Sequence, residues 1–276
     1  MISAGIVKLH EDDKYSLPYE KPLLKRWGHA ASVLLVFNEM FPQLEKVMAE
    51  DGPKGYGYYD SFLRWMDTYR TTEIFQEWNK IHLIPILEFK QGTEFTLLDI
   101  GCGCGQHIRE AAKLYPNCMF YGIDSDTPSI DRAIKEQGDQ KNIIYHHMRG
   151  EQLSQEWKEK FDFVLMNEVL HVASDVDGIL KEAKRVLKPD GYGITYDPPV
   201  SSDPQKQANN STAQLFFPFG LFTCLPACLS DPSGEGRGVG WGYEHKKQKI
   251  EEYGFRVIKI GQKDTEAVQA GIIFQK

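Results

Sequence analysis

The sequence predicts an α/β fold: a doubly wound, mostly parallel seven-stranded sheet with a mainly helical N-terminal subdomain. From residue 91 onward, short apolar runs alternate with amphipathic stretches of helical period. The apolar runs are nearly continuous, as expected for strands that are buried on both faces of a parallel sheet. A glycine-rich turn, GCGCG at 101–105, directly follows the first of these runs. Ligands of such sheets bind beyond the carboxyl ends of the strands, so this turn is the first candidate site.

Residues 1–90 are expected to form the helical subdomain. The stretch GIVKLHEDDKYSLP at 5–18 predicts a β-hairpin with the charged EDDK at its turn. Apolar residues at helical spacing predict a helix over 22–50 that is broken by Pro42. The same spacing predicts one or two amphipathic helices over 58–89.

The second domain, residues 91–276, is expected to alternate strands with helices. Strands are predicted at 95–100, 119–124, 142–147, 161–167, 192–198, 256–262 and 270–276. Helices are predicted at 105–115, 127–138, 175–191 and 245–255. An insertion at about 199–243 interrupts this rhythm with polar, strongly apolar and glycine-rich segments, and its prolines make it poor material for a strand. Such an insertion forms either additional core or a lid over a site.

Charge and hydropathy exclude several classes of protein. The chain of 276 residues carries a net charge of −7, which argues against a nucleic-acid binder that works through phosphate contacts. The apolar stretch near the start, AASVLLVF at 30–37, is too short to span a bilayer. No basic segment followed by an apolar one precedes it, as a secretory signal would require. We therefore expect a cytoplasmic protein with no membrane partner.

The cysteines and histidines give no sign of a metal. The five cysteines, an odd number without a regular framework, fit reduced thiols inside a cell. The CGC of the glycine turn lacks the second pair of ligands that a zinc site needs. His146 and His147 are adjacent in a predicted strand and therefore point to opposite faces. We expect no metal cofactor.

The spacing of the glycine turn separates two classes of cofactor. Dinucleotide binders require G-x-G-x-x-G, whereas this turn reads G-x-G-x-G and has Gln106 where the third glycine would follow. A nicotinamide oxidoreductase is therefore disfavoured. Asp99 precedes the turn, and Asp124 ends the next predicted strand, where its carboxylate could accept hydrogen bonds from ribose hydroxyls.

Four stretches in this order resemble the class I S-adenosylmethionine-dependent methyltransferases: LLDIGCGCGQ, FYGIDSD, FDFVLMNEVLHV and LKPDGYGITYD. The resemblance implies a Rossmann-like sheet whose last strand is antiparallel, and S-adenosyl-L-methionine as the cofactor. It implies cofactor contacts from Asp99, Gly101, Cys102, Gly103, Asp124, Ser125, Arg149, Gly150 and Asn167. Tyr59 is a further candidate to cap the cofactor, because tyrosine joins an apolar face to a polar tip; the alternative is a core aromatic of the helical region.

A narrower resemblance concerns the two ends of the chain. The 5–18 segment is similar to the wing of the winged-helix subdomain that precedes some O-methyltransferases, and CLPACLS with the following GVGWGYEHKKQKIEEYGF resembles the C-terminal part of mycobacterial-type relatives. Because the resemblance starts at the wing, we expect no recognition helix from this segment. The resemblance implies that residues 1–90 serve as a homodimer surface and as a back wall of the substrate pocket.

Three residues are candidates for the chemistry. His171 follows the fourth strand and is expected at the rim of the pocket, where related O-methyltransferases carry their general base, and histidine titrates near neutral pH. The alternative is a solvated histidine at a helix start. Asp197 ends the fifth strand and could orient the acceptor or take its proton, although the Asp-Pro pair is also typical of a turn. Glu168 follows the fourth strand and equally fits an acid at a helix N-terminus.

The sequence therefore predicts methyl transfer from S-adenosylmethionine to the oxygen or nitrogen of a small-molecule acceptor, with no nucleic-acid partner. The alternative is a catalytically weak or inactive S-adenosylmethionine-binding regulator or scaffold, since a fold does not by itself imply a function.

Overall fold

The computed structural model describes residues 8–12, 14–16, 31–69, 72–90, 92–208, 210–261 and 270–276. The chain divides into two compact units, Met1–Pro42 with Tyr58–Thr71 and Gln43–Gly57 with Thr72–Lys276. The domain boundary expected between residues 90 and 91 remains a prediction.

Among its described residues, the first unit contains a short hairpin, one helix, and the first part of another helix that continues past Pro42. Strands β1 (Lys8–Leu9) and β2 (Tyr15–Ser16) pair antiparallel, as the 5–18 segment predicted. The 22–30 part of the predicted helix lies outside the described residues. The expected break at Pro42 is wrong: α2 (Val33–Val47) continues through this proline, which removes only one backbone hydrogen-bond donor from the helix. Helix α3 spans Asp60–Tyr69.

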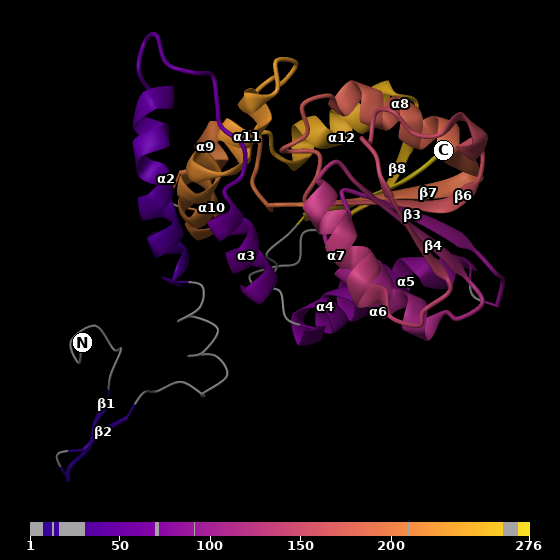
Figure 1. The fold of residues 1–276 in the computed structure, drawn as a ribbon, viewed down its shortest axis with the longest axis horizontal. Helices are drawn as coiled ribbons and strands as arrows, with labels where there is room; N and C mark the ends of the chain where they lie inside the picture. The colour runs from indigo at the N-terminus through magenta and orange to yellow at the C-terminus, as the bar shows by residue number, and fades with distance from the viewer. Residues whose placement is uncertain are drawn as a thin grey trace. The chain divides into compact units, whose positions relative to one another are not determined.

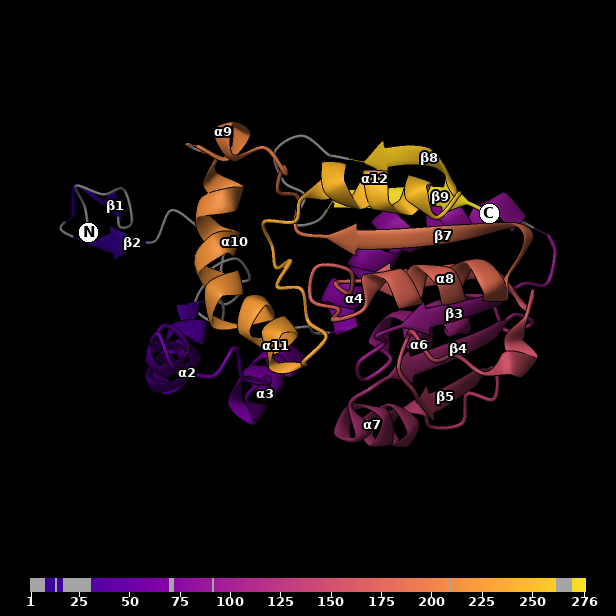
Figure 2. The ribbon, with the colours of Figure 1, turned by 90° about the horizontal axis from the view of Figure 1, so that it is seen from above.

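The second unit is built on a seven-stranded sheet. The strands are β3 (Thr96–Ile100), β4 (Met119–Asp124), β5 (Ile143–His147), β6 (Phe161–Asn167), β7 (Leu187–Asp197), β8 (Arg256–Gly261) and β9 (Ala270–Gln275). Their order is β5-β4-β3-β6-β7-β9-β8, and Figure 2 shows the strands lying beside one another from β8 at the top to β5 at the bottom. The first five are parallel, and β9 runs antiparallel to both of its neighbours. The predicted Rossmann-like sheet with an antiparallel last strand is confirmed.

Helices cover both faces of this sheet (Figure 1). The first part of the unit holds α4 (Thr72–Trp78), the π-helical turn η1 (Asn79–Leu83), α5 (Ile84–Leu87), the 3-10 turn η2 (Glu88–Lys90), α6 (Gln106–Leu114) and α7 (Thr127–Gln137). The remainder holds the 3-10 turn η3 (Gln155–Trp157), α8 (Val176–Val186), α9 (Pro204–Gln207), α10 (Ser211–Phe222), α11 (Cys224–Ser230) and α12 (Tyr243–Glu252).

The two faces of the sheet carry separate hydrophobic cores, because consecutive strand residues point to opposite sides. Leu97 packs in the core that holds Ile108 of α6, whereas its neighbour Leu98 packs in the core that holds Leu180 of α8 and Ile250 of α12. Both leucines are fully buried. This double burial explains why the central strands read as continuous apolar runs.

The boundary between α8 and β7 differs from the prediction. The helix expected over 175–191 ends at Val186, and Leu187 already has extended backbone at φ −67° and ψ 137°. Pro189 disfavours helical backbone in the residue before it, so strand β7 begins earlier than the predicted 192.

The 199–243 insertion is largely helical. Thr223 separates α10 from α11, and its Oγ1 donates to the carbonyl oxygen of Phe219 at 2.8 Å. By length and composition alone, the helical segment Ala213–Ser230 would suffice to cross a membrane, with a mean hydropathy of 1.5 and 28% of it buried. Ala213 and Cys224 pack with Val200 and Val239 in a third small core, and Val172 of the turn after β6 packs against it, which anchors the insertion to the sheet.

Candidate active site

The glycine turn has left-handed backbone, which glycine adopts more readily than any other residue. Gly101, Gly103 and Gly105 all have positive φ, at 72°, 53° and 72°. A Cβ on Gly105 would lie 2.2 Å from the hydroxyl oxygen of Tyr145, and one on Gly101 would lie 2.6 Å from Cγ2 of Val169. A Cβ on Gly103 would meet nothing within 4 Å. The outer two glycines are therefore required by packing, whereas Gly103 faces open space at the carboxyl edge of the sheet.

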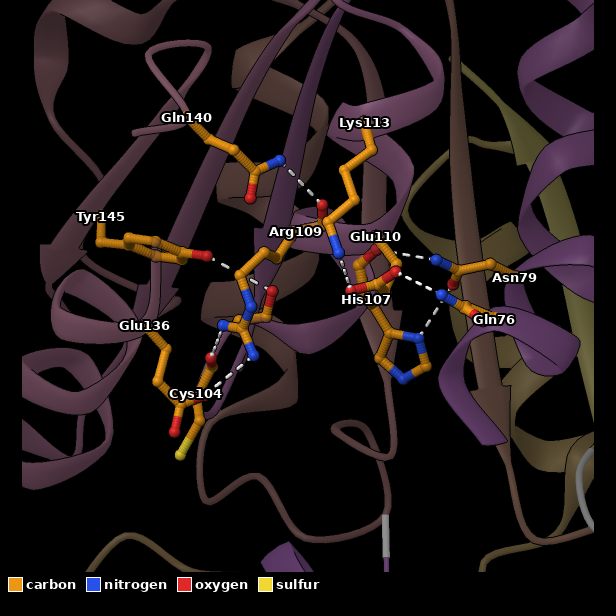
Figure 3. A network of polar contacts seen from close by, with 11 residues as sticks. Gln76, Asn79, Cys104, His107, Arg109, Glu110, Lys113, Glu136, Gln140 and Tyr145 are labelled. Atoms are coloured by element: carbon orange, nitrogen blue, oxygen red, sulfur yellow. Dashed lines mark hydrogen bonds and ion pairs between the residues drawn. The ribbon is translucent and has the colours of Figure 1, made fainter. Parts of the chain in front are cut away.

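A polar network fixes this turn to helix α6 (Figure 3). The guanidinium of Arg109 donates to the carbonyl oxygen of Cys104 at 2.7 Å and to Glu136 at 2.9 Å. The Tyr145 hydroxyl donates to the carbonyl oxygen of Gly105 at 3.3 Å, and Gln140 donates to the carbonyl of Arg109 at 3.0 Å. These contacts hold the N-terminus of α6, with its free N–H groups, beside the turn.

Asp124 holds the glycine turn from the neighbouring strand. Its Oδ2 accepts from the backbone N–H of Gly103 at 2.8 Å, and its Oδ1 accepts from that of Asp126 at 2.9 Å. Each carboxylate oxygen has a second lone pair, so ribose hydroxyls can still be bound. Ser125 follows Asp124 directly, and its carbonyl oxygen contacts Nε2 of His147 at 2.9 Å.

Asp99 is a buried acid whose carboxyl group has no donor among the described residues. It is 1% exposed, and within the described part of the chain neither carboxylate oxygen has a hydrogen-bond partner. Burial raises the pKa of Asp99 well above its ordinary value, and the nearby charge of Asp124 adds to the effect. A buried carboxyl without donors is costly, and a cationic N–H donor of a ligand would relieve that cost.

Asn167 at the end of β6 presents a second unsatisfied acceptor. Its Nδ2 donates to Nε2 of His107 at 3.0 Å, so His107 carries its proton on Nδ1 and donates to Oδ1 of Asn79 at 3.1 Å. This chain of donors fixes the amide orientation. It leaves Oδ1 of Asn167 buried and without a partner in the described residues.

The remaining predicted cofactor residues have structural contacts of their own. Cys102 lies buried beneath the turn. Arg149 donates to Ser174 at 3.2 Å and pairs with Asp231 of the insertion at 3.1 Å. A Cβ on Gly150 would lie 2.7 Å from Cγ2 of Ile100, so packing alone requires a glycine there. Tyr59 belongs to the first unit, and its role toward the cofactor stays a prediction.

The three predicted catalytic residues do meet, but not at a solvated rim. His171 is 2% exposed, so the expectation of a histidine at the pocket rim or a solvated helix start is wrong. Its Nδ1 is hydrogen-bonded to Oδ1 of Asp197, and its Nε2 lies 3.7 Å from Oε2 of Glu168. The turn after β6 carries Glu168 in left-handed backbone at φ 59° and directs His171 inward, under the insertion.

Three further residues of this cluster were missed by the sequence analysis. Sγ of Cys224 lies 3.3 Å from Nε2 of His171. Thr195 donates to Oδ2 of Asp197 at 3.1 Å, and Nζ of Lys246 lies 4.0 Å from the same oxygen. Lys246 is 1% exposed, and its ammonium lacks a hydrogen bond among the described residues. No local spacing joins residues 171, 197, 224 and 246, so only the fold reveals the cluster.

The charges of this cluster depend on one another. Burial alone would lower the pKa of His171, but the thiolate form of Cys224 and the carboxylate of Asp197 raise that pKa well above its ordinary value. Burial opposes ionisation of Asp197, whereas Lys246 and His171 hold its pKa below the ordinary value. Burial lowers the pKa of Lys246. Asp197 thus lies between two cationic groups, with one oxygen toward each.

Residues 98–195 match the family model described as a methyltransferase domain. Over 133 residues the chain is 26% identical to a malonyl-[acyl-carrier protein] O-methyltransferase of Legionella pneumophila, an alignment covering 48% of this chain and 46% of that protein. Over 107 residues it is 37% identical to a tRNA (guanine-N(7)-)-methyltransferase of Helicobacter pylori, covering 35% of this chain and 26% of that protein. Each alignment thus spans less than half of the relative.

A solved structure described as a putative O-methyltransferase from Nostoc punctiforme has a similar fold. Its TM-score is 0.67 at 17% identity, covering 100% of this chain and 81% of that one. Residues 98–195 are thus similar to methyltransferase domains, whose cofactor is S-adenosyl-L-methionine, and the fold is similar to that of a solved methyltransferase structure.

Proposed function

We propose that this chain, from the methyltransferase domain at residues 98–195, transfers the methyl group of S-adenosylmethionine to the oxygen or nitrogen of a small-molecule acceptor. One observation carries the proposal: the buried, unpartnered carboxyl of Asp99 lies beside a left-handed glycine turn whose Gly103 is open to a ligand. A group with a cationic amine and an apolar body fits both features.

The residues present fit this cofactor. Asp99 would meet its ammonium group, Asp124 its ribose hydroxyls, and Gly103 would allow the close approach of the backbone. When bound, the cofactor supplies a sulfonium methyl group for an in-line displacement, in which positioning provides much of the rate acceleration. The buried Oδ1 of Asn167 offers a further acceptor at the same edge of the sheet.

An acceptor hydroxyl or ammonium must lose a proton, and we propose His171 as the base. Its Nδ1 is oriented by Asp197, which leaves Nε2 to take the proton, with Glu168 and Cys224 beside it. This arrangement lies next to the glycine turn, because Val169 in the same loop contacts Gly101. Asp197 therefore acts as a positioning residue for the imidazole.

A small acceptor is supported by the charge of −7 and by the apolar insertion above His171. The comparisons give no support for excluding nucleic acid, because a tRNA methyltransferase is among the relatives. We propose further that the insertion serves as a lid, and that the N-terminal hairpin and helices belong to a winged-helix-like subdomain that forms a homodimer surface. The antiparallel β1–β2 pair supports the wing.

Turnover tests this function. The protein is incubated with S-adenosylmethionine carrying a labelled methyl group and, in separate reactions, a small-metabolite extract or a tRNA pool. Label in the metabolite fraction supports the proposal, and label in tRNA alone contradicts the small-molecule acceptor. Cofactor binding without label in any fraction would favour the regulator or scaffold alternative.

A further inference from the structure

Lys246 of α12 carries a buried ammonium group that makes no hydrogen bond within the described part of the chain. The residue is 1% exposed and lies in the first turn of the helix, where its backbone N–H donates to the carbonyl oxygen of Gly242. A buried cation without acceptors is costly, because it loses its water and gains no hydrogen bond in return. The three N–H donors of this ammonium are therefore available to a ligand.

The two side chains beside this ammonium do not satisfy it. Oδ2 of Asp197 lies 4.0 Å from Nζ, which is beyond hydrogen-bonding distance, and already accepts from Thr195 at 3.1 Å. The ring centroid of Trp241 lies 5.7 Å from Nζ, close to the outer limit of about 6 Å for a cation–π contact. Asp197 thus offsets part of the charge of Lys246 without using its N–H groups.

The place of Lys246 in the fold points to the acceptor rather than to the cofactor. The glycine turn follows β3, whereas Asp197 ends β7, and β6 lies between these two strands in the sheet. Neighbouring strands are about 4.8 Å apart, so the ends of β3 and β7 are separated by roughly 10 Å across the sheet. The other oxygen of Asp197 is hydrogen-bonded to Nδ1 of His171, the proposed base. Lys246 therefore lies beside the residues proposed to act on the acceptor.

The charges around Lys246 favour a negatively charged ligand. Lysine is almost never fully buried unless it is paired, and a neutral donor could bind a neutral oxygen at a much lower cost. Asp197 shares its charge between Lys246 and His171. Burial lowers the pKa of Lys246 even though the charges of Asp197 and Glu168 act in the opposite direction, so these acids do not fully compensate the buried ammonium. A carboxylate on the ligand would supply the missing compensation.

We propose that the ammonium of Lys246 binds a carboxylate of the methyl acceptor, which makes the substrate a small carboxylic acid with a second, nucleophilic oxygen or nitrogen. This inference rests on the proposed function. The imidazole of His171 and the carboxylate of Asp197 separate Lys246 from Nε2, where the acceptor's proton would be taken. The carboxylate and the methylated atom therefore occupy different positions on the acceptor. Lys246 is buried like His171, so the acceptor reaches both when the proposed lid moves.

The test compares benzoate with benzamide, two probes of nearly equal size that differ in charge. Each is titrated calorimetrically into the full chain saturated with S-adenosylhomocysteine. We expect benzoate to bind about tenfold more tightly, because a hydrogen bond between two ionised groups is roughly twice as strong as one to a neutral oxygen. Lys246→Met keeps much of the side-chain volume but removes the charge, and it should abolish this preference.

Lys247→Met is the matched control. It removes the charge of the next residue on α12, whose Nζ pairs with Glu251 at 2.7 Å and whose side chain is 41% exposed. This variant should keep the preference for benzoate. Thermal melts show whether each variant is folded, and the wild-type comparison of the two probes decides the matter if Lys246→Met does not fold.

The proposal is overturned if benzoate binds to the wild-type chain no more tightly than benzamide, or if Lys246→Met keeps the wild-type preference. S-adenosylhomocysteine carries the carboxylate of the cofactor. A lower affinity of Lys246→Met for S-adenosylhomocysteine, without a benzoate preference in the wild type, would assign the ammonium to the cofactor and would also overturn the proposal.

Label transfer to a metabolite extract that is separated by anion exchange tests the proposed function apart from this inference. Label in the acidic metabolites supports both. Label confined to neutral and basic metabolites would refute this inference alone. A benzoate preference that depends on Lys246, without label in any fraction, would refute only the proposed function.

Discussion

The carboxylate of Asp124 accepts a hydrogen bond from the backbone N–H of Gly103 at 2.8 Å. This contact ties the end of strand β4 to the middle of the glycine turn, so one side chain both shapes the turn and faces the space that Gly103 leaves open. Cofactor affinity and local order of the turn are therefore coupled through Asp124.

Replacing Asp124 with alanine should weaken S-adenosylmethionine binding by about 1.5–3 kcal/mol, which is roughly 10–150-fold, because hydrogen bonds to a charged group are lost. Isothermal titration calorimetry with the cofactor and with S-adenosylhomocysteine measures this change. Asp126→Ala is a matched control, since Asp126 caps helix α7 through the backbone N–H of Ser129. It should cost about 0.5–2 kcal/mol of stability and leave affinity unchanged. Equal affinities for wild type and Asp124→Ala would remove this carboxylate from the site.

The glycines of the turn should respond differently to substitution. Gly103→Val should give a folded protein that has lost cofactor binding, because the residue faces open space and pays only about 1–2 kcal/mol for its left-handed backbone. Gly105→Val should unfold at a much lower temperature, since its Cβ would overlap Tyr145. Thermal melts and calorimetry separate the two effects. A Gly103→Val protein that binds the cofactor normally would contradict the open-cradle interpretation.

Asp99→Asn should stabilise the protein without cofactor while weakening cofactor binding about 10–100-fold. The folded-state pKa of Asp99 is raised, so ionisation at neutral pH works against folding. The stability advantage of the asparagine variant should therefore be small near pH 4, grow as the pH rises through the folded pKa of Asp99, and then level off. Urea unfolding of both proteins across this range measures it. A variant less stable than wild type at neutral pH would show that the carboxylate has a donor in the folded state.

The sheet was predictable from the sequence because strands that are buried on both faces consist almost entirely of apolar residues. Leu97 and Leu98 are both apolar because each packs in a different hydrophobic core. The glycines at 101, 103 and 105 indicate left-handed backbone. The end of α8 was not predictable in the same way. Pro189 predicts the end of the helix, but the residues just before a proline can adopt either helical or extended backbone. Leu187 is extended because it pairs with Phe161 of β6.

Only part of the candidate catalytic cluster could be predicted from the sequence. His171, Asp197 and Glu168 follow strands and share an edge of the sheet, so topology alone brings them together. The packing of the insertion brings Cys224 to His171, and the first turn of α12 brings Lys246 to Asp197. No hydrophobic periodicity in either segment indicates that these side chains face the site. Burial of His171 likewise depends on the insertion, which explains why it was expected at the rim.

His171→Ala should leave cofactor affinity nearly intact while turnover falls about 10²–10⁴-fold, as for loss of a general base. The imidazole must be neutral to take a proton. Because Cys224 and Asp197 raise its pKa, the wild-type rate should increase with pH through an inflection above the ordinary histidine value of about 6.5, and the variant should lose this inflection.

A second variant, Cys224→Ser, changes the pKa of His171 but keeps the imidazole in place. Cys224→Ser removes the thiolate that favours the protonated imidazole, so the inflection should move to lower pH while His171 stays oriented by Asp197. Stopped assays of label transfer across pH, with saturating cofactor, measure both variants. If His171→Ala keeps the wild-type rate and pH profile, proton removal passes to Glu168 or is unnecessary because the acceptor is already an anion or a free amine. If its cofactor affinity falls with no separate loss of rate, His171 is a structural residue of the turn after β6.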